Sequence, residues 1–330
     1  MSWYIEIRTV TIDEVDQRLD RWFSKHFPTI PHGKISKLLR TGQIRVDGRR
    51  AKVNYRLMLG QTIRIPSLFN GVIYESHSTK PFQQDVMTGD KLVKSVLYRD
   101  EEIIAINKPA GLAVQGGSGL TKHVDGALDM LRFEANERPR LVHRLDKYTS
   151  GVLILARQRS AARRLINVFR AKSAIKIYLA LVMGEPQPTF GRINLPIAKV
   201  LNKVREKMMI VQENGKSAFT RYVTLEKLSC HVTLVALFPV TGRTHQLRVH
   251  MAAIGTPILG DRKYGGAKAF LRNDLVSKNI HLHAWAIRIP SYGGGKLEVT
   301  APLRDHMMRS LHFFGVKPER YKLPFSFFGC

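Results

Sequence analysis

Cysteine is nearly absent from this chain: its 330 residues include two, Cys230 and Cys330. Because the two lie far apart and no Cys-x-x-Cys pair occurs, the sequence predicts neither a disulfide framework nor a zinc knuckle. Long apolar runs are absent as well. The longest ones, such as Val232–Val240, fall far short of the roughly 18 residues that a membrane-spanning helix needs. Both absences favour a reducing compartment and a protein that does not span a membrane.

The N-terminal segment also lacks the features of a targeting sequence. MSWYIEIRTVTIDEVDQ has no basic stretch followed by an apolar one, as a secretory signal has. Its early acids Glu6, Asp13 and Glu14 argue against an organelle transit peptide. We therefore expect a cytoplasmic protein.

Acidic residues are scarce relative to basic ones. The chain has 26 Asp and Glu against 53 Lys and Arg, which gives a formal net charge of +27. A folded protein does not need this excess, and the repulsion between like charges weakly destabilises the compact state. The usual reason for such a charge is a polyanionic partner, either nucleic acid or an anionic membrane surface. The membrane is the weaker alternative, because no amphipathic segment pairs a basic face with exposed aromatic residues.

Residues 1–66 have the pattern of a small separate unit. Apolar residues recur at helical spacing from Ile12 to Phe23, and Pro28 and Pro31 end that pattern. After this helix we predict a helix over Gly33–Leu39, a strand and tight turn over Gln43–Gly48, and a closing strand over Gln61–Ile65.

Basic residues concentrate in this small unit. The segment Lys34–Arg56 holds eight cations and one acid, Asp47, for a local charge of +7. Such a run is often only a solvated face, but here it covers a helix and a hairpin that have little core of their own, which favours contact with phosphates. The nucleic-acid-binding candidates on this surface are Lys34, Lys37, Arg40, Arg45 and Arg49.

A turn-rich stretch separates this unit from a longer region. Residues 67–94 are rich in Ser, Gln and turn formers without a sustained period, which predicts an interdomain linker. We place a large α+β domain at 95–315 and a basic, then aromatic, tail at 316–330. Its clearest strands are Ile103–Asn107, Gly151–Ala156, Tyr178–Val182, His231–Phe238 and Ile280–Ile289, and its clearest helices are Ala161–Arg170 and His245–Ala253.

Asp146 stands at the most distinctive turn of the sequence. The apolar pair Leu141–Val142 leads into the charged stretch His143–Lys147, and Thr149–Gly151 turns the chain into a strongly apolar strand. We expect this arrangement to hold the Asp146 carboxylate at the end of a sheet, with cations as sequence neighbours. By composition alone, an Asp beside Arg and Lys is more often a surface ion pair. A structural and a catalytic interpretation are therefore both open.

Two further segments carry chemistry-bearing side chains. Thr241–His250 is a polar turn between a strand and a helix, and its two arginines and two histidines suit a phosphate or a carboxylate as well as plain surface polarity. Arg157–Lys176 has seven cations, Arg163 and Arg164 among them, and no acid. Tyr178 follows it, either as a core residue or as a platform for a nucleic-acid base.

The stretch His143–Gly151, HRLDKYTSG, resembles the catalytic motif of the RluA family of RNA pseudouridine synthases. Residues 1–66 are similar to an S4 RNA-binding domain, and Gln115–Leu120, which contains GGSG, is most similar to the RluC type. Four more motifs of the family occur in its order: NKPxG at Asn107–Gly111, K-x-Y-x-A-x-V-x-G at Lys176–Gly184, G-R-T-H-Q-[IL]-R within Thr241–Arg248, and GD-x-x-YG at Gly260–Gly265. Agreement of five ordered motifs by chance is very improbable.

The resemblance implies a role for each of four residues. Asp146 matches the essential aspartate, and Arg144 matches the arginine that helps to extrude the target uridine and fill its place in the stack. Tyr178 matches the tyrosine that stacks on the uracil, and Arg243 the arginine that pairs with the aspartate. The resemblance also implies an α+β fold, in which a small S4-like domain joins a large domain with a central mixed, mainly antiparallel sheet flanked by helices.

The chemistry of pseudouridine formation fits these residue types. The uridine C–N glycosidic bond breaks, the base turns and it rejoins the sugar through carbon, so we expect neither a metal nor a cofactor. One ionised carboxylate is required, and a nearby guanidinium favours the charged form. Extruding the uridine costs a few kcal/mol, and stacking on Tyr178, about 1–3 kcal/mol, offsets that cost together with phosphate contacts. The residue types leave open whether Asp146 attacks the sugar, attacks the base or removes a proton from the sugar.

The expected partner is RNA, and 23S ribosomal RNA before others because the S4-like unit suits structured ribosomal RNA. We expect the protein to act as a monomer. Two alternatives stay open: a pseudouridine synthase that acts on transfer RNA, and a non-catalytic RNA-binding protein in which Asp146 is structural.

Overall fold

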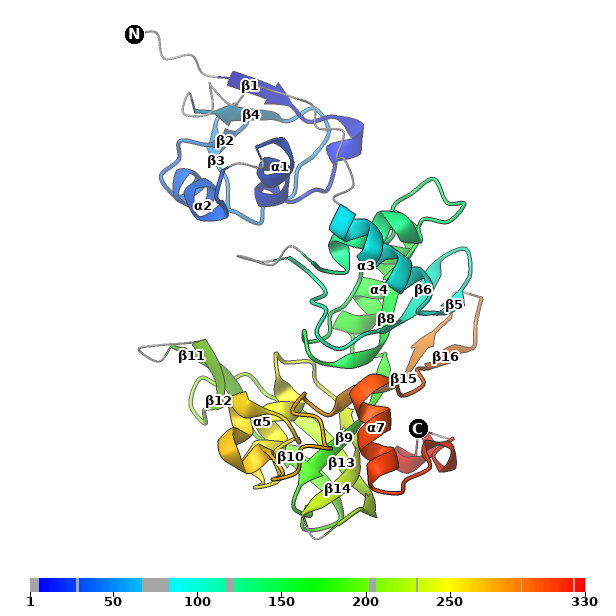
Figure 1. Ribbon diagram of the computed structural model, residues 1–330. Coiled ribbons are helices and arrows are strands. Elements are labelled where there is room, and N and C mark those ends of the chain that lie inside the picture. The colour runs from blue at the N-terminus through cyan, green and yellow to red at the C-terminus, as the bar shows by residue number, and fades with distance from the viewer. Residues whose placement is uncertain are drawn as a thin grey trace. The chain divides into compact units, whose positions relative to one another are not determined.

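The computed structural model describes residues 6–27, 30–66, 83–116, 122–201, 206–229, 231–291, 293–322 and 324–329 (Figure 1). The chain divides into two compact units, Met1–Lys80 and Pro81–Cys330. Within the described ranges, no helix is both long enough and apolar enough to span a bilayer.

The first unit packs two helices against a four-stranded antiparallel sheet of strand order β1-β4-β2-β3. Its core is made of large apolar side chains, including Trp22, Phe23 and Phe27 of the first helix region and Ile35 and Ile63 opposite them. Its elements are β1 (Glu6–Thr9), the 3₁₀-helix η1 (Ile12–Glu14), α1 (Leu19–His26), α2 (His32–Arg40), β2 (Arg45–Val46), β3 (Arg49–Arg50) and β4 (Thr62–Ile65). The second predicted helix and the closing strand are confirmed.

The apolar repeat over residues 12–23 does not form one helix, contrary to its spacing. Asp16 has a φ of +66°, and the chain turns there before α1 begins at Leu19. The Asp16 amide donates to the Leu57 carbonyl at 2.7 Å, and the Leu19 amide donates to the Tyr55 carbonyl at 2.8 Å. These hydrogen bonds to a distant segment replace helical ones, and a local repeat carries no information about them.

The second unit is built on a ten-stranded sheet whose main path is β10-β13-β14-β9-β15-β8-β6-β5, with β16 beside β15 and β7 beside β8. Every pair is antiparallel except β8 with β15, so the predicted mixed, mainly antiparallel sheet with flanking helices is confirmed. Its elements are α3 (Gln83–Val93), β5 (Val96–Arg99), β6 (Ile103–Lys108), η3 (Asp125–Leu131), β7 (Arg140–Leu141), β8 (Ser150–Ala156), α4 (Arg159–Arg170), β9 (Ile175–Met183), β10 (Phe190–Asn194), β13 (Phe219–Lys227), β14 (Val232–Pro239), α5 (Gln246–Ala253), α6 (Arg262–Gly265), η4 (Gly266–Ala269), β15 (Leu282–Pro290), β16 (Lys296–Thr300), α7 (Asp305–Phe313), η5 (Pro318–Arg320) and η6 (Ser326–Phe328). A separate hairpin joins β11 (Ile197–Leu201) to β12 (Glu206–Ile210).

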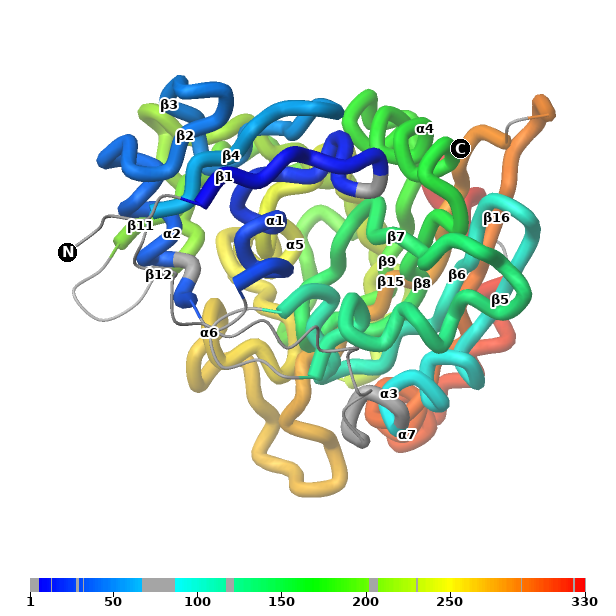
Figure 2. Tube along the Cα trace, turned by 90° about the horizontal axis from the view of Figure 1, so that it is seen from above, coloured from blue at the N-terminus to red at the C-terminus, as the bar shows by residue number. Residues whose placement is uncertain are grey.

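Helices cover both faces of this sheet. On β6 and β8, α4 packs on one face, while α3 and η3 pack on the other (Figure 2). On β9, Leu179 faces α7 and Ala180 faces α5. Because both faces are covered, β8 is apolar at almost every position and not only at alternate ones, which explains why it is so clear in the sequence.

Two predicted domain limits are wrong. The second half of the predicted linker 67–94 forms α3, whose Leu92 is buried against Ile104 and Ile106; residues 67–82 lie outside the described residues. The predicted tail 316–330 belongs to the core of the second unit, because Phe325 and Phe328 are buried beside α7 and β14. Both segments pack on the second unit through only a few apolar side chains. These are too few to give a recognisable helix or strand pattern in the sequence.

Gly151 marks the point where β8 leaves the loop that carries Asp146. Its φ is +108°, and a Cβ atom built there would lie 2.1 Å from the carbonyl oxygen of Ala284 on the parallel neighbour β15. Only glycine satisfies both the dihedral angle and the close approach. The glycine of the Thr-Ser-Gly sequence is therefore a packing requirement at the start of the central parallel pair.

Gly151→Ala is expected to destabilise the second unit by about 2–5 kcal/mol, because backbone strain and overlap with β15 add. Gly255→Ala is the matched control: its φ is +83°, but no atom lies within 4 Å of the added Cβ. We expect that control to cost about 1–2 kcal/mol. Calorimetric melting of both variants measures the difference, and equal losses would contradict the close approach.

Candidate active site

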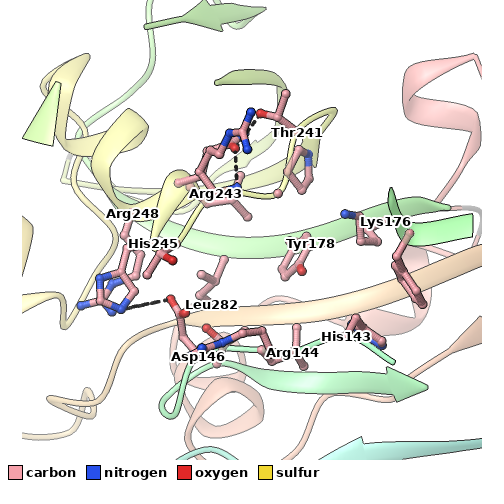
Figure 3. A pocket seen from close by; sticks show the side chains of 18 of the residues that line it. His143, Arg144, Asp146, Lys176, Tyr178, Thr241, Arg243, His245, Arg248 and Leu282 are labelled. Atoms are coloured by element: carbon pink, nitrogen blue, oxygen red, sulfur yellow. Dashed lines mark hydrogen bonds and ion pairs between the residues drawn. The ribbon is translucent and has the colours of Figure 1, made fainter. Parts of the chain in front are cut away.

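A pocket of 380 Å³ gathers residues from five separate segments of the second unit (Figure 3). They are the 142–149 loop, the end of α4, strand β9, the turn and helix over 239–248, and the start of β15. The predicted site residues Arg144, Asp146, Tyr178 and Arg243 all line it. A volume of this size is typical of pockets for a small molecule or a single extruded nucleotide.

The base of the Asp146 loop is fixed by His143. The Nε2 atom of this ring accepts the Ile154 amide of β8 at 2.8 Å, and the ring stacks on Phe169 with centroids 4.3 Å apart. Burial lowers the pKa of His143 to about 3, and the nearby charge of Lys176 acts in the same direction. His143 is therefore a neutral acceptor that holds the loop against β8 and α4.

Lys108 ties the same loop to the Asn107–Gly111 turn. Its fully buried ammonium donates to the carbonyl oxygens of Pro109 at 2.9 Å, Leu112 at 2.8 Å and Lys147 at 3.2 Å. Burial lowers the pKa of Lys108 to about 7, while the Asp146 charge opposes that shift. This lysine positions the segment next to Asp146.

The Asp146 carboxylate is 21% exposed and faces two side chains of the 239–248 segment. The Arg248 Nη1 lies 3.8 Å from Asp146 Oδ2, and the His245 Nε2 lies 3.7 Å from the same oxygen (Figure 3). The pocket therefore presents one carboxylate with a permanent cation and an imidazole beside a single oxygen atom.

Arg248 is held in place by a second, fully buried carboxylate. Its Nε and Nη2 donate to the two oxygens of Asp261 at 2.7 Å and 2.8 Å. Burial lowers the pKa of Arg248, but the hydrogen bonds and charge of Asp261 outweigh this effect and the net pKa is raised. The guanidinium therefore stays charged and directs its remaining nitrogen toward Asp146.

Arg243 is not the arginine that pairs with Asp146, which corrects the sequence prediction. Its Nε donates to the Ser217 carbonyl at 3.0 Å, and it lies on the opposite wall of the pocket (Figure 3). The turn is set by buried Gln246, whose Oε1 accepts the Arg243 amide at 3.1 Å. Because α5 begins at Gln246, the second arginine of the motif, Arg248, is the one carried round to the carboxylate.

Tyr178 and Arg144 reach the pocket from β9 and from the Asp146 loop. Burial raises the pKa of Tyr178, and the Asp146 charge raises it further, so the phenol is neutral. Arg144 is exposed. The pocket thus combines a neutral aromatic side chain with an exposed guanidinium.

The sequence assigned no role to three residues at or behind the site: Lys108, Asp261 and Tyr264. For His245 and Arg248 it gave only the general prediction that the arginines and histidines of Thr241–His250 suit a phosphate or a carboxylate. All five lie inside the family motifs Asn107–Gly111, Thr241–Arg248 and Gly260–Gly265. One feature of the site has no signature in the sequence. His245 adopts a φ of +55°, which is rare for a residue other than glycine. Its Nδ1 lies 2.6 Å from the Tyr264 hydroxyl.

The predicted nucleic-acid-binding residues of the first unit differ in their exposure and in their hydrogen bonds. Lys34, Lys37, Arg40 and Arg49 are exposed. Arg45 instead spans its own turn, because it donates to the carbonyl oxygens of Gly42 at 3.1 Å and Gly48 at 3.0 Å. A surface hollow of 770 Å³ beside α2 is lined by four cations: Lys37, Arg40, Arg50 and Lys52.

The seven cations of Arg157–Lys176 do not form one surface track. Arg163 is exposed, but Arg164 pairs with Glu102, so its assignment as a nucleic-acid contact is not supported. Arg157 is buried and donates to the Asp100 carbonyl at 2.5 Å, and Lys176 lines the pocket. Within the part of the chain that the structure describes, no group of three His, Cys, Asp or Glu side chains is arranged to hold a metal ion.

Comparison with known proteins indicates a family for the chain. The sequence pattern described as RNA pseudouridylate synthase matches residues 102–253, from β6 to α5. The chain is 37% identical over 311 residues to the ribosomal large subunit pseudouridine synthase C of Escherichia coli O157:H7, which covers 93% of this chain and 96% of that protein. The Haemophilus influenzae protein of the same name is 38% identical over 310 residues, 93% of this chain and 94% of that protein.

A solved structure also indicates similarity to RNA pseudouridylate synthases. Human RNA pseudouridylate synthase domain containing 4 superposes with a TM-score of 0.60 at 29% identity, over 72% of this chain and 98% of that one. Because the first unit spans only Met1–Lys80, most of a match of this extent lies in the second unit, which carries the sheet and the pocket.

Proposed function

The chain belongs to the RNA pseudouridylate synthase family, and we propose that its pocket isomerises uridines of large-subunit ribosomal RNA to pseudouridine, with Asp146 as the essential carboxylate. The observation that carries the proposal is the placement of Asp146 against Arg248, in a pocket that Tyr178 also lines. The relatives named as large-subunit enzymes support the choice of RNA.

The chemistry assigns a task to each of these side chains. A target uridine leaves the RNA stack and enters the pocket, where the neutral ring of Tyr178 offers a face for the base. Asp146 acts as an anion on the sugar or the base, and Arg248 stabilises that charge. The C1′–N1 bond breaks, the base turns, a C1′–C5 bond forms, and the proton on C5 is exchanged for one on N1. Exposed Arg144 lies at the pocket and is suited to occupy the vacated place in the stack.

The first unit supplies sequence-independent contacts in this proposal. Its exposed cations on α2 and around the hollow beside α2 suit the RNA backbone, because phosphate contacts depend on charge rather than on base identity. We propose a monomer as the working form, since Asp146, Arg248, Tyr178 and Arg144 already lie together in one unit.

Mapping pseudouridines in cells that lack this protein tests the function. We expect specific sites in 23S ribosomal RNA to revert to uridine and to return when the wild-type gene is restored. Loss of sites in transfer RNA alone would move the substrate to that class, and no lost site in any RNA would refute the enzymatic assignment.

A charge variant tests the role of the first unit. Replacing Lys34, Lys37 and Arg40 by Ala removes up to three phosphate contacts, so the slope of log K against log salt should fall by about 2–3. The matched control exchanges the cations (Lys34→Arg, Lys37→Arg and Arg40→Lys) and should keep the slope. An unchanged slope in the Ala variant would show that α2 does not touch the RNA.

A further inference from the structure

His245 and Tyr264 lie beside Asp146 without a task in the chemistry above. Three atoms define their arrangement: the Tyr264 hydroxyl is 2.6 Å from His245 Nδ1, and His245 Nε2 is 3.7 Å from Asp146 Oδ2. The imidazole thus stands between a phenol and the carboxylate. Its backbone has a left-handed φ of +55° directly before α5, a strained geometry of the kind that concentrates at functional sites.

From this geometry we propose that His245 is a positioning residue that donates its Nε2–H toward Asp146, and that Tyr264 fixes this tautomer by donating its hydroxyl proton to Nδ1. The effect that we expect on the reaction rate rests on the proposed function. The tautomer itself does not, because it can be measured in the protein without RNA.

The direction of the Tyr264 hydrogen bond follows from the charge beside the other ring nitrogen of His245. A tyrosine hydroxyl can donate its proton to an unprotonated ring nitrogen, and His245 Nδ1 is at hydrogen-bonding distance. In the opposite tautomer, the bare lone pair of Nε2 would face the anionic Oδ2 of Asp146, which is a repulsive arrangement.

Burial keeps the His245 ring neutral, so that its tautomer matters. Burial lowers the pKa of His245, and the cations of Arg248 and Lys263 act in the same direction, while Asp146 and Asp261 oppose it. Burial also raises the pKa of Tyr264 to about 12, which leaves its hydroxyl proton available as a donor. A neutral imidazole with Nδ1 occupied by a donor carries its single proton on Nε2.

The arrangement also bears on which oxygen of the Asp146 carboxylate meets the substrate. Arg248 supplies charge to Oδ2, and its own orientation is set by Asp261. His245 approaches that same oxygen from the residue before α5, with its orientation set by Tyr264. Two independently anchored groups, each within 4 Å of the same oxygen, favour one orientation of the carboxylate and leave Oδ1 for the substrate.

The tautomer is measured directly by ¹⁵N NMR of the ring nitrogens in the full-length wild-type protein, with His245→Gln used to assign the signal. We expect a protonated Nε2 and an unprotonated, hydrogen-bonded Nδ1. A proton on Nδ1 instead would overturn the proposal, whatever the activity of the enzyme. Tyr264→Phe removes the hydroxyl donor and should let the other tautomer appear.

Single-turnover rates supply the second measurement. His245→Ala should lower the rate on saturating RNA by about 10- to 100-fold with unchanged RNA affinity, as loss of one preorganised donor does. His245→Gln, whose amide can donate from nearly the same place, should recover most of the rate. Exposed His312 gives the control, since His312→Ala should change neither quantity. Equal losses in the Ala and Gln variants would show that the side chain only packs.

Discussion

Asp146→Ala is expected to abolish pseudouridine formation and to leave RNA binding within about twofold of the wild type. The carboxylate is the only group in the proposal that acts as an anion on the reacting nucleotide, so its loss should cost about 10⁴-fold or more, as removal of other essential nucleophiles does. Binding should survive because the exposed cations of α2 and the aromatic face of Tyr178 are untouched.

Asp146→Asn makes the same test with less change of shape. The amide keeps the size of the side chain but carries no negative charge, so we expect the same loss of turnover. Asp274→Asn is the matched control, because Asp274 is 97% exposed and lies away from the pocket. Pseudouridine content in a 23S transcript and filter binding of the same RNA provide the two measurements. Pseudouridine formation by either Asp146 variant would refute the catalytic assignment. It would favour the interpretation of Asp146 as part of a surface ion pair.

How far the sequence predicts this site depends on which contacts are local. The loop with Asp146 is defined by residues that are adjacent in the chain, so its apolar entrance, charged turn and Gly151 exit could all be predicted. The order of five motifs then identified the family and with it Tyr178 and Arg144. The prediction that Arg243 pairs with Asp146 was wrong because the motif holds two arginines. Only the start of α5 at Gln246 decides which of them turns toward the carboxylate.

Counting charges along the chain does not predict an RNA-binding surface either, because it ignores contacts with distant segments. The segment Arg157–Lys176 reads as a continuous basic run, but Arg164 pairs with Glu102, and Arg157 turns inward to the Asp100 carbonyl. These partners precede the segment by more than fifty residues and join it through the pairing of β6 with β8. Lys108 is a similar case, because the carbonyl oxygens that hold its ammonium are backbone groups, which have no signature in the sequence.

Arg248→Met is expected to cost both stability and turnover, for separable reasons. The side chain is 6% exposed and its partner Asp261 is 1% exposed, so removing the guanidinium leaves a buried, unpaired carboxylate. Such a loss destabilises a protein by about 3–5 kcal/mol. Turnover should fall by about 10²-fold or more as well, because the charge that stabilises the Asp146 anion is gone.

The double variant Arg248→Met with Asp261→Asn separates these two effects. The introduced amide carries no charge, and its carbonyl oxygen can still accept the backbone amides of Lys263 and Tyr264 at the start of α6, so most of the lost stability should return. Turnover should not return, because Asp146 still lacks its cation. Thermal melting and single-turnover rates of the two single variants and the double variant complete the cycle. If turnover recovers together with stability, Arg248 acts only by holding the fold, and the role given to its charge beside Asp146 is wrong.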